Sequence, residues 1–446
     1  MKKNEEISNN FENIRQINEV KENENNIKEN KDKKDEIKSQ EKQKKKKIKK
    51  KKSKSLFPYK NNYDKNKIIE NDEKAKILKE IKENEKKIKK LDFGDYEMLQ
   101  NLSKSKVNSR SDNTFIIFKS INDICCLIYA NKIEEKNNSI VSYNILDYKK
   151  LVEIKNAHNE DISNFRHYLD KMNHRDLILS ISSKDHNIRL WDITDVQFLL
   201  NIRNVNRRGF LKSACFLNHN NQIFIVSSNF LHSLNSEPIK IFDLTGNKIK
   251  EINSNNNNTF FIDTYYDIKT NINYIITGQY GFVKSYDYNN NKKYHKYKEN
   301  KHIDNYEHHS VIITNNDVEV KLIETSENRV IRIWDFHSKE LLSKIQVSES
   351  SSDNLYGISL LNDEYLFVGC GNCIKLVDLE NEEVSNTLVD YNYNVITVKT
   401  VTHPQYGECL ISQDLYEGQI KLWVNKINKC QHILDELYKK LNEHFN

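Results

Sequence analysis

The sequence predicts an all-β fold, a seven-bladed β-propeller of four-stranded antiparallel blades, with a disordered and helical basic N-terminal arm and a short C-terminal helix. Three observations support this prediction: a strand motif that recurs about every 45 residues, a fixed order of apolar segments between the motifs, and a change of composition near residue 93. We expect a disordered arm rich in Lys, Asn and Glu at 1–66, an amphipathic or short coiled-coil helix at 67–92, the propeller at 93–427 and a C-terminal helix at 428–446.

The recurring motif is a β-branched residue, a polar residue and an apolar residue, followed by an aromatic residue or Val and usually by Asp. Its alternation with a period of two is typical of a half-buried strand. Successive anchor residues, at the aromatic or Val position, are 43 to 51 positions apart. A repeat of about 40–45 residues with four strands indicates a propeller blade. The anchors are Tyr143, Trp191, Phe242, Tyr286, Trp334, Val377 and Trp423.

The segments between anchors return in the same order. After Trp191 the chain gives QFLLNI, FLKSACFL and QIFIVSS before the next motif, and a similar series follows Trp334. After Trp423 no further strand is predicted, so the seventh blade lacks its outer strand. The segment YEMLQNL (96–102) resembles the outer strands, and we expect it to pair with the last blade and close the ring, which removes open strand edges. The alternative is that 96–102 continues the preceding helix.

The charge of the chain is divided unevenly. Residues 1–92 contain 30 basic and 19 acidic residues, and residues 93–446 contain 40 and 45. This asymmetry is typical of an interaction tail on an acidic body. The densest basic run, Lys42–Lys54, fits a nuclear-import signal or a nucleic-acid patch, an anionic surface as target, or a solvated tail that reflects coding bias.

Two segments predict amphipathic helices. In 67–92, apolar residues recur at heptad spacing for two to three heptads, which allows weak self-association through this segment. Near the C-terminus, apolar residues fall on one helical face, which we expect to pack against the propeller; a partner-docking helix is the alternative. The first stripe is Ile77, Ile81, Ile88 and Leu91, with Asn84 at the intervening heptad position, and the second is Ile427, Cys430, Ile433, Leu434, Leu437 and Leu441.

Composition also constrains the compartment. The N-terminus has no apolar signal region, and no apolar stretch reaches the roughly 18 residues needed to cross a bilayer. The seven cysteines are odd in number and irregular in spacing, which argues against a disulfide framework. We therefore expect a cytoplasmic protein, or a nuclear one, with no transmembrane segment.

The motifs at IRLWD (188–192) and IRIWD (331–335) make the repeats resemble the WD-repeat (WD40) family. The resemblance covers about residues 94–427 and implies a hydrogen-bonded network of a turn Asp, a His, a Ser or Thr and the Trp. One blade offers a full set: His158, Ser182 (or Ser183), Asp185 and Trp191. The other blades look incomplete, and we expect them to depend more on apolar packing.

Neither a catalytic site nor a cofactor or metal site is predicted. The sequence contains no nucleophile elbow, phosphate loop or zinc-protease helix, and its ten glycines leave little material for phosphate cradles. Cys370-Gly-Asn-Cys373 lies between two predicted strands, where Gly-Asn indicates a hairpin turn, and no second ligand pair has zinc-site spacing. His308 and His309 are interpreted as a degenerate form of the Gly-His that opens family repeats.

These observations predict a non-catalytic scaffold or adaptor that binds protein partners on the propeller face. The family resemblance implies that residues just before the tight-turn position project from this face. The alternatives are a nucleic-acid-associated factor similar to those of ribosome assembly, with the basic arm binding phosphates, and a substrate receptor of a ubiquitin ligase. The predicted partner-binding residues are Lys136, Lys184, Gln279, Glu327 and Tyr416.

Overall fold

The structure is a computed structural model that describes residues 61–104, 113–134, 137–203, 205, 210–230, 238–253, 258–290, 293–299, 306–316 and 318–445. The chain divides into two units, residues 1–73 and 74–446. The boundary lies within α2 (Asn61–Ile88), and in the first unit the described residues are those of the start of this helix. The basic run 42–54 therefore lies outside the described residues.

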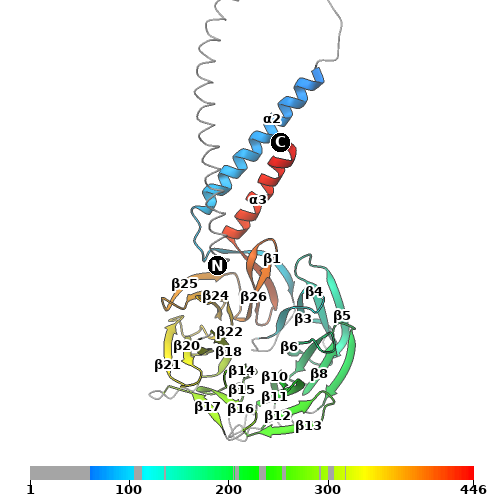
Figure 1. The fold of residues 1–446 in the computed structure, drawn as a ribbon, viewed down its shortest axis with the longest axis vertical. Coiled ribbons are helices and arrows are strands. Elements are labelled where there is room, and N and C mark those ends of the chain that lie inside the picture. Colours follow the sequence, from blue (N-terminus) through cyan, green and yellow to red (C-terminus); the bar gives the residue numbers. More distant parts are fainter. Residues whose placement is uncertain are drawn as a thin grey trace, which may run out of the picture. The chain divides into compact units, whose positions relative to one another are not determined.

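The second unit contains the predicted propeller. Seven four-stranded antiparallel sheets follow one another around a ring, and the path from cyan to orange in Figure 1 passes through them in chain order. In each of the first six blades the first strand is the innermost and the fourth lies at the rim. The predicted fold class is confirmed.

The first four blades take up residues 115–297. Blade 1 consists of β2 (Phe115–Lys119), β3 (Cys125–Glu134), β4 (Asn137–Asn144) and β5 (Lys150–His158). Blade 2 consists of β6 (Ile162–Asp170), β7 (Arg175–Ser182), β8 (Asn187–Asp192) and β9 (Gln197–Ile202). Blade 3 consists of β10 (Phe210–His219), β11 (Gln222–Phe230), β12 (Ile239–Asp243) and β13 (Lys248–Ile252). Blade 4 consists of β14 (Phe261–Asp267), β15 (Ile272–Gln279), β16 (Phe282–Asp287) and β17 (Tyr294–Tyr297).

The last three blades complete the ring. Blade 5 consists of β18 (His308–Asn315), β19 (Val320–Ser326), β20 (Val330–Asp335) and β21 (Leu341–Gln346). Blade 6 consists of β22 (Leu355–Leu360), β23 (Tyr365–Cys370), β24 (Cys373–Asp378) and β25 (Glu383–Val389). Blade 7 consists of β26 (Val395–His403), β27 (Gly407–Asp414), β28 (Gln419–Asn425) and, from the start of the chain, β1 (Tyr96–Lys104).

All seven anchors lie in the third strand of their blade, in β4, β8, β12, β16, β20, β24 and β28. Six of them are buried, and Tyr143 is half-buried. The core is correspondingly distributed: seven clusters of buried apolar residues each join two neighbouring blades, and the cluster containing Phe115 and Leu422 joins blade 7 to blade 1. Since each blade buries apolar side chains against the neighbouring blade on both sides, apolar burial stabilises the ring as a whole.

Strand β1 closes the ring as predicted. It pairs antiparallel with β28, from Tyr96 opposite Asn425 to Lys104 opposite Gln419, with two irregularities in register. The alternative, a helix continuing through 96–102, is wrong. The closure is reinforced at Asn425, whose Nδ2 donates a 2.7 Å hydrogen bond to the carbonyl of Phe93.

The first turns of the C-terminal helix α3 (Lys426–Phe445) contact blade 7, where Nδ2 of Asn428 donates to the carbonyl of Tyr406 at 3.0 Å. From Ile433 onward its apolar stripe packs against α2, so the expectation that this part of the stripe packs against the propeller was wrong. Its Leu434 and Leu437 form a buried cluster with Ile81, and Ile77 and Ile88 of the same seam pack against this cluster. The apolar seam predicted for self-association therefore has a partner within the chain. The helix α3 follows β28 directly, and Oδ1 of Asn425 caps its start by accepting the backbone N–H of Ile427 at 2.9 Å.

Candidate functional site

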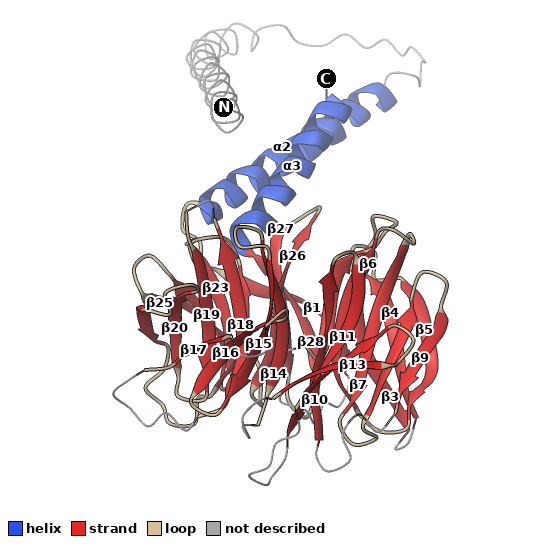
Figure 2. Ribbon diagram, turned by 60° about the horizontal axis from the view of Figure 1, so that its bottom comes forward, coloured by secondary structure: helices blue, strands red, loops and turns tan. Residues whose placement is uncertain are grey.

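The two ends of the ring differ in what they present. The turns between second and third strands, together with the loops between blades, form one end, which we call the upper face. The turns between first and second strands form the lower face. Strand β28 runs from the upper to the lower face before it enters α3. The helix α3 therefore leaves the ring from the lower face, which is drawn at the top of Figure 2, while the upper face is drawn at the bottom.

Blade 2 contains a complete network of the family type. The Nδ1 of His158 lies 3.2 Å from Oδ2 of Asp185, its Nε2 lies 2.9 Å from Oγ of Ser180, and the indole of Trp191 donates to the same Oγ at 2.8 Å. Burial lowers the pKa of His158. Burial alone would raise the pKa of Asp185, but the hydrogen bond and charge of His158 outweigh it and lower that pKa. The serine between His158 and Trp191 is thus Ser180, and the predicted choice of Ser182 or Ser183 was wrong.

Blade 5 builds the network with a carboxylate in place of the serine. Glu324 is fully buried and hydrogen-bonds to Nδ1 of His308, and the indole of Trp334 donates to its other oxygen at 3.2 Å. The guanidinium of Arg332 lies 3.8 Å from Glu324. Burial alone would raise the pKa of Glu324, but the charges of His308 and Arg332 lower it. His308 therefore takes the same place in blade 5 that His158 takes in blade 2.

Blade 7 replaces the histidine with a tyrosine. The hydroxyl of Tyr391 lies 2.7 Å from Oγ of Ser412, which also accepts the indole N–H of Trp423 at 2.7 Å. Nearby, the buried Asp414 accepts the backbone N–H of Gln419 at 2.6 Å, while its second oxygen has no hydrogen bond to the described residues. Burial raises the pKa of Asp414 to about 6. This carboxylate is therefore costly to ionise.

We expect Asp414→Asn to raise the free energy of unfolding at pH 7 and to change it little at pH 4. An unfolded Asp titrates near a pKa of about 3.9, and the folded pKa is higher, so the stabilisation is complete below pH 4 and is lost as the pH rises through about 6. The gain at pH 7 is at most roughly 3 kcal/mol. Urea unfolding of both proteins between pH 4 and pH 7 measures it. Asp335→Asn is a control of opposite sign, because hydrogen bonds from Ser338 lower the pKa of Asp335; equal pH profiles for Asp414→Asn and the parent chain would contradict the assignment.

Gln279 lies inside blade 4, in a hydrogen-bonded group that includes the anchor Tyr286, and its predicted role in partner binding was wrong. It is fully buried, and its Nε2 lies 3.3 Å from both Oγ1 of Thr277 and the hydroxyl of the anchor Tyr286. The reason is the length of the turn. Only Tyr280 and Gly281 separate β15 from β16, so the position seven residues before the anchor still lies in a strand.

The remaining predicted partner-binding residues that the structure describes lie on the upper face. Lys184 is exposed, Glu327 is partly exposed, and Tyr416 is 52% exposed. Tyr416 has a φ of 72° in the turn between β27 and β28, and its ring meets that of Tyr393 edge to face at 5.5 Å. Lys136 lies outside the described residues.

Sequence reasoning missed three other exposed tyrosines of this face. Tyr280, Tyr306 and Tyr393 are 41%, 45% and 42% exposed. Tyr280 is in a turn between second and third strands, and the other two are in loops between blades. The family resemblance points only to the position before each tight turn, whereas Tyr306 and Tyr393 lie in the loops between blades.

All seven cysteines are free thiols. Cys370 and Cys373 are opposite each other in the register of β23 and β24, on either side of the turn, which confirms the predicted hairpin. The hydrogen bond with Cys373, together with burial, raises the pKa of Cys370. A thiol held protonated is a poor nucleophile.

One group of three ligand-type side chains lies close together among the described residues: Glu307, His309 and Glu327, on the upper face of blade 5. Neither of the described helices is long and apolar enough to cross a lipid bilayer. In comparisons with known proteins, no family model and no curated protein matches the chain.

Proposed function

We propose that this chain is a divergent WD-repeat propeller that acts as a non-catalytic scaffold or adaptor and binds protein partners on its upper face. The observation that carries the proposal is the set of exposed tyrosines there, contributed by blade 4, blade 7 and the loops that enter blades 5 and 7. They are Tyr280, Tyr306, Tyr393 and Tyr416. Tyrosine is enriched among the residues that dominate binding energy, because it offers a large rigid surface and a polar end.

Carboxylates accompany these tyrosines. The hydroxyl of Tyr280 lies 3.2 Å from Glu307, and Glu417 follows Tyr416 directly in the turn of blade 7. Aromatic faces next to carboxylates suit Arg and Lys side chains, which stack on the ring and pair with the acid. We therefore expect the bound segment of the partner to be basic.

A cytoplasmic or nuclear location is part of the proposal. The seven free thiols support it, because disulfides persist in oxidising compartments and are rare in the cytosol and the nucleus.

The test is co-purification of partners with full-length protein carrying Tyr416→Ala. Truncation of a dominant interface tyrosine costs at least about 2 kcal/mol, so we expect recovery to fall roughly 30-fold. Tyr266→Ala is the matched control, because Tyr266 is 48% exposed and lies near the lower face at the end of β14. If the upper-face variant retained every partner while its circular dichroism matched that of the parent chain, the upper face would not be the binding surface.

A further inference from the structure

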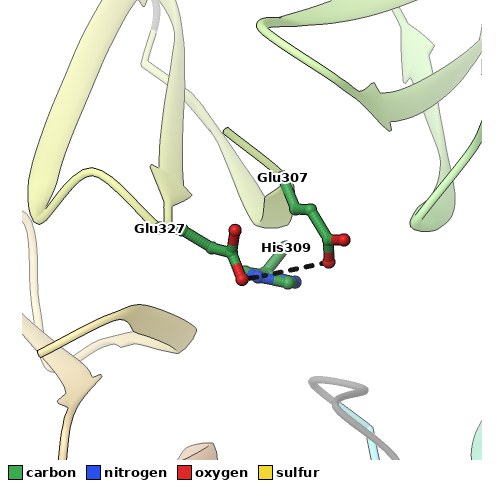
Figure 3. A group of neighbouring side chains, drawn as sticks. All are labelled: Glu307, His309 and Glu327. Atoms are coloured by element: carbon green, nitrogen blue, oxygen red, sulfur yellow. Dashed lines mark ion pairs between the residues drawn. The ribbon is translucent and has the colours of Figure 1, made fainter. Parts of the chain in front are cut away.

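Three side chains converge at the upper end of blade 5 (Figure 3). The Nε2 of His309 lies 3.6 Å from a carboxylate oxygen of Glu327 and 4.0 Å from one of Glu307. One donor atom of each of the three residues lies within 4.8 Å of those of the other two. Glu307 precedes β18, His309 is in β18, and Glu327 is in the turn after β19, so the blade itself brings them together.

The imidazole of His309 has an unsatisfied nitrogen. Its ring packs against Tyr356, with centroids 4.9 Å apart, and the residue is only 4% exposed. Its Nε2 makes no hydrogen bond to any of the described residues, although it points between two carboxylates. Leaving a buried polar atom without a partner costs about 1–3 kcal/mol, so a water molecule or an ion bound at this nitrogen would be stabilising.

We propose that Glu307, His309 and Glu327 bind a divalent transition-metal ion, with Zn²⁺ as the best fit. An imidazole nitrogen and two carboxylate oxygens are among the ligands that Zn²⁺ takes in proteins. A tetrahedral ion with bonds of about 2.0–2.2 Å separates its ligand atoms by roughly 3.3–3.6 Å. The separations between Nε2 of His309 and the two carboxylates are 3.6 and 4.0 Å, close to this value, and all three donor atoms lie within 4.8 Å of one another.

Neighbouring groups hold both carboxylates in place. The hydroxyl of Tyr280 donates to Oε1 of Glu307 at 3.2 Å, which leaves Oε2 facing His309, and Nδ2 of Asn354 lies 3.4 Å from Glu327. The backbone N–H of Glu327 donates to the carbonyl of Glu307 at 3.1 Å. Hydrogen bonds of this kind orient metal ligands and contribute to affinity.

Three protein ligands leave one coordination position open. Both glutamate side chains are 19% exposed, so this position is accessible from the upper face, next to the exposed Tyr280. A bound ion would tie the loop entering blade 5 to the turn of that blade, and it would offer its open position to a carboxylate or imidazole of a partner. This inference does not depend on the proposed function, because ion binding can be measured without any partner.

The experiment is titration of full-length, chelator-treated protein with Zn²⁺ by calorimetry, and with Co²⁺ by absorption spectroscopy. We expect one Zn²⁺ per chain with a dissociation constant in the roughly micromolar range or below. Co²⁺ should show the bands of a tetrahedral site with nitrogen and oxygen ligands and no thiolate charge-transfer band. Glu307→Gln and Glu327→Gln should each weaken Zn²⁺ binding at least tenfold, and Tyr280→Phe should weaken it less.

Glu417→Gln is the matched control, because Glu417 is a carboxylate of the same face in the corresponding turn of blade 7, and it should leave Zn²⁺ binding unchanged. The glutamine variants keep the size of the side chains, and unchanged melting curves without metal would show that they fold. The proposal is overturned if the parent chain does not bind Zn²⁺ or if both glutamine variants bind it as tightly as the parent chain. It is also overturned if the Co²⁺ spectrum shows thiolate ligands, which would place the ion at the cysteines.

Discussion

Glu324→Ala should lower the free energy of unfolding by roughly 3–5 kcal/mol, the range expected when one partner of a buried ion pair is removed. Glu324 pairs with His308, and it also accepts the indole N–H of Trp334 and faces Arg332. Without it, a buried imidazole, a buried indole N–H and part of a buried guanidinium charge lose their acceptor. Chemical unfolding at pH 7, followed by fluorescence and by circular dichroism, measures the loss.

Ser180→Ala is the matched control, because Ser180 occupies the corresponding place in blade 2 and is neutral. It should cost about 1–3 kcal/mol, the price of unpaired neutral groups. Glu324→Gln keeps the shape and one acceptor oxygen, so its effect should lie between the two. A loss for Glu324→Ala no greater than that for Ser180→Ala would show that the buried charge is not what stabilises blade 5.

Tyr96→Ala should weaken ring closure and lower the free energy of unfolding by roughly 3–5 kcal/mol, as for other large buried aromatic residues. Tyr96 is 6% exposed at the start of β1, and its ring meets Phe367 of blade 6 edge to face at 5.2 Å. The truncation loosens β1 from β28 and so exposes a strand edge. We therefore also expect concentration-dependent association, because open edges pair with other chains.

Met98→Ala provides the control within the same strand, since Met98 is 43% exposed and should change stability by no more than about 0.5 kcal/mol. Thermal unfolding and light scattering at several protein concentrations measure both effects. An equal loss for the two variants would mean that β1 contributes through its backbone pairing alone.

The fold could be predicted because each anchor holds one place in its blade. The aromatic residue or Val of every motif lies in a third strand, so the spacing of the anchors measures the blade directly. The missing outer strand of blade 7 followed from the same count, and β1 supplies it. Two features could not be predicted from the strand pattern: the serine of the blade 2 network and the surface that buries α3. Ser180 and Ser182 point to the same face of β7, so alternation alone could not select between them. The apolar stripe of α3 indicates that the helix is buried, but not against which surface.

The upper face could be predicted only where the turns keep their length. Tyr416 lies in a four-residue turn and Glu327 in a three-residue turn, so the position before the tight turn is still outside the strands. The two-residue turn of blade 4 moves Gln279 into β15 and exposes Tyr280 instead. Glu324 departs from the pattern in another way. A charged residue in a strand is usually expected at the surface, and contacts with His308, Trp334 and Arg332 make the burial of Glu324 tolerable.

Ring closure through β1 sets an order of events during synthesis. The contact between Asn425 and Phe93 joins positions 332 residues apart. At elongation rates of about 5–20 residues per second, the ribosome needs roughly 15–65 s to make the chain between them. During this interval β1 has no strand to pair with, while the blades that follow can form one after another. The growing chain therefore carries an unpaired strand near its start until its last blade emerges, and β1 is the segment that a molecular chaperone would be expected to hold.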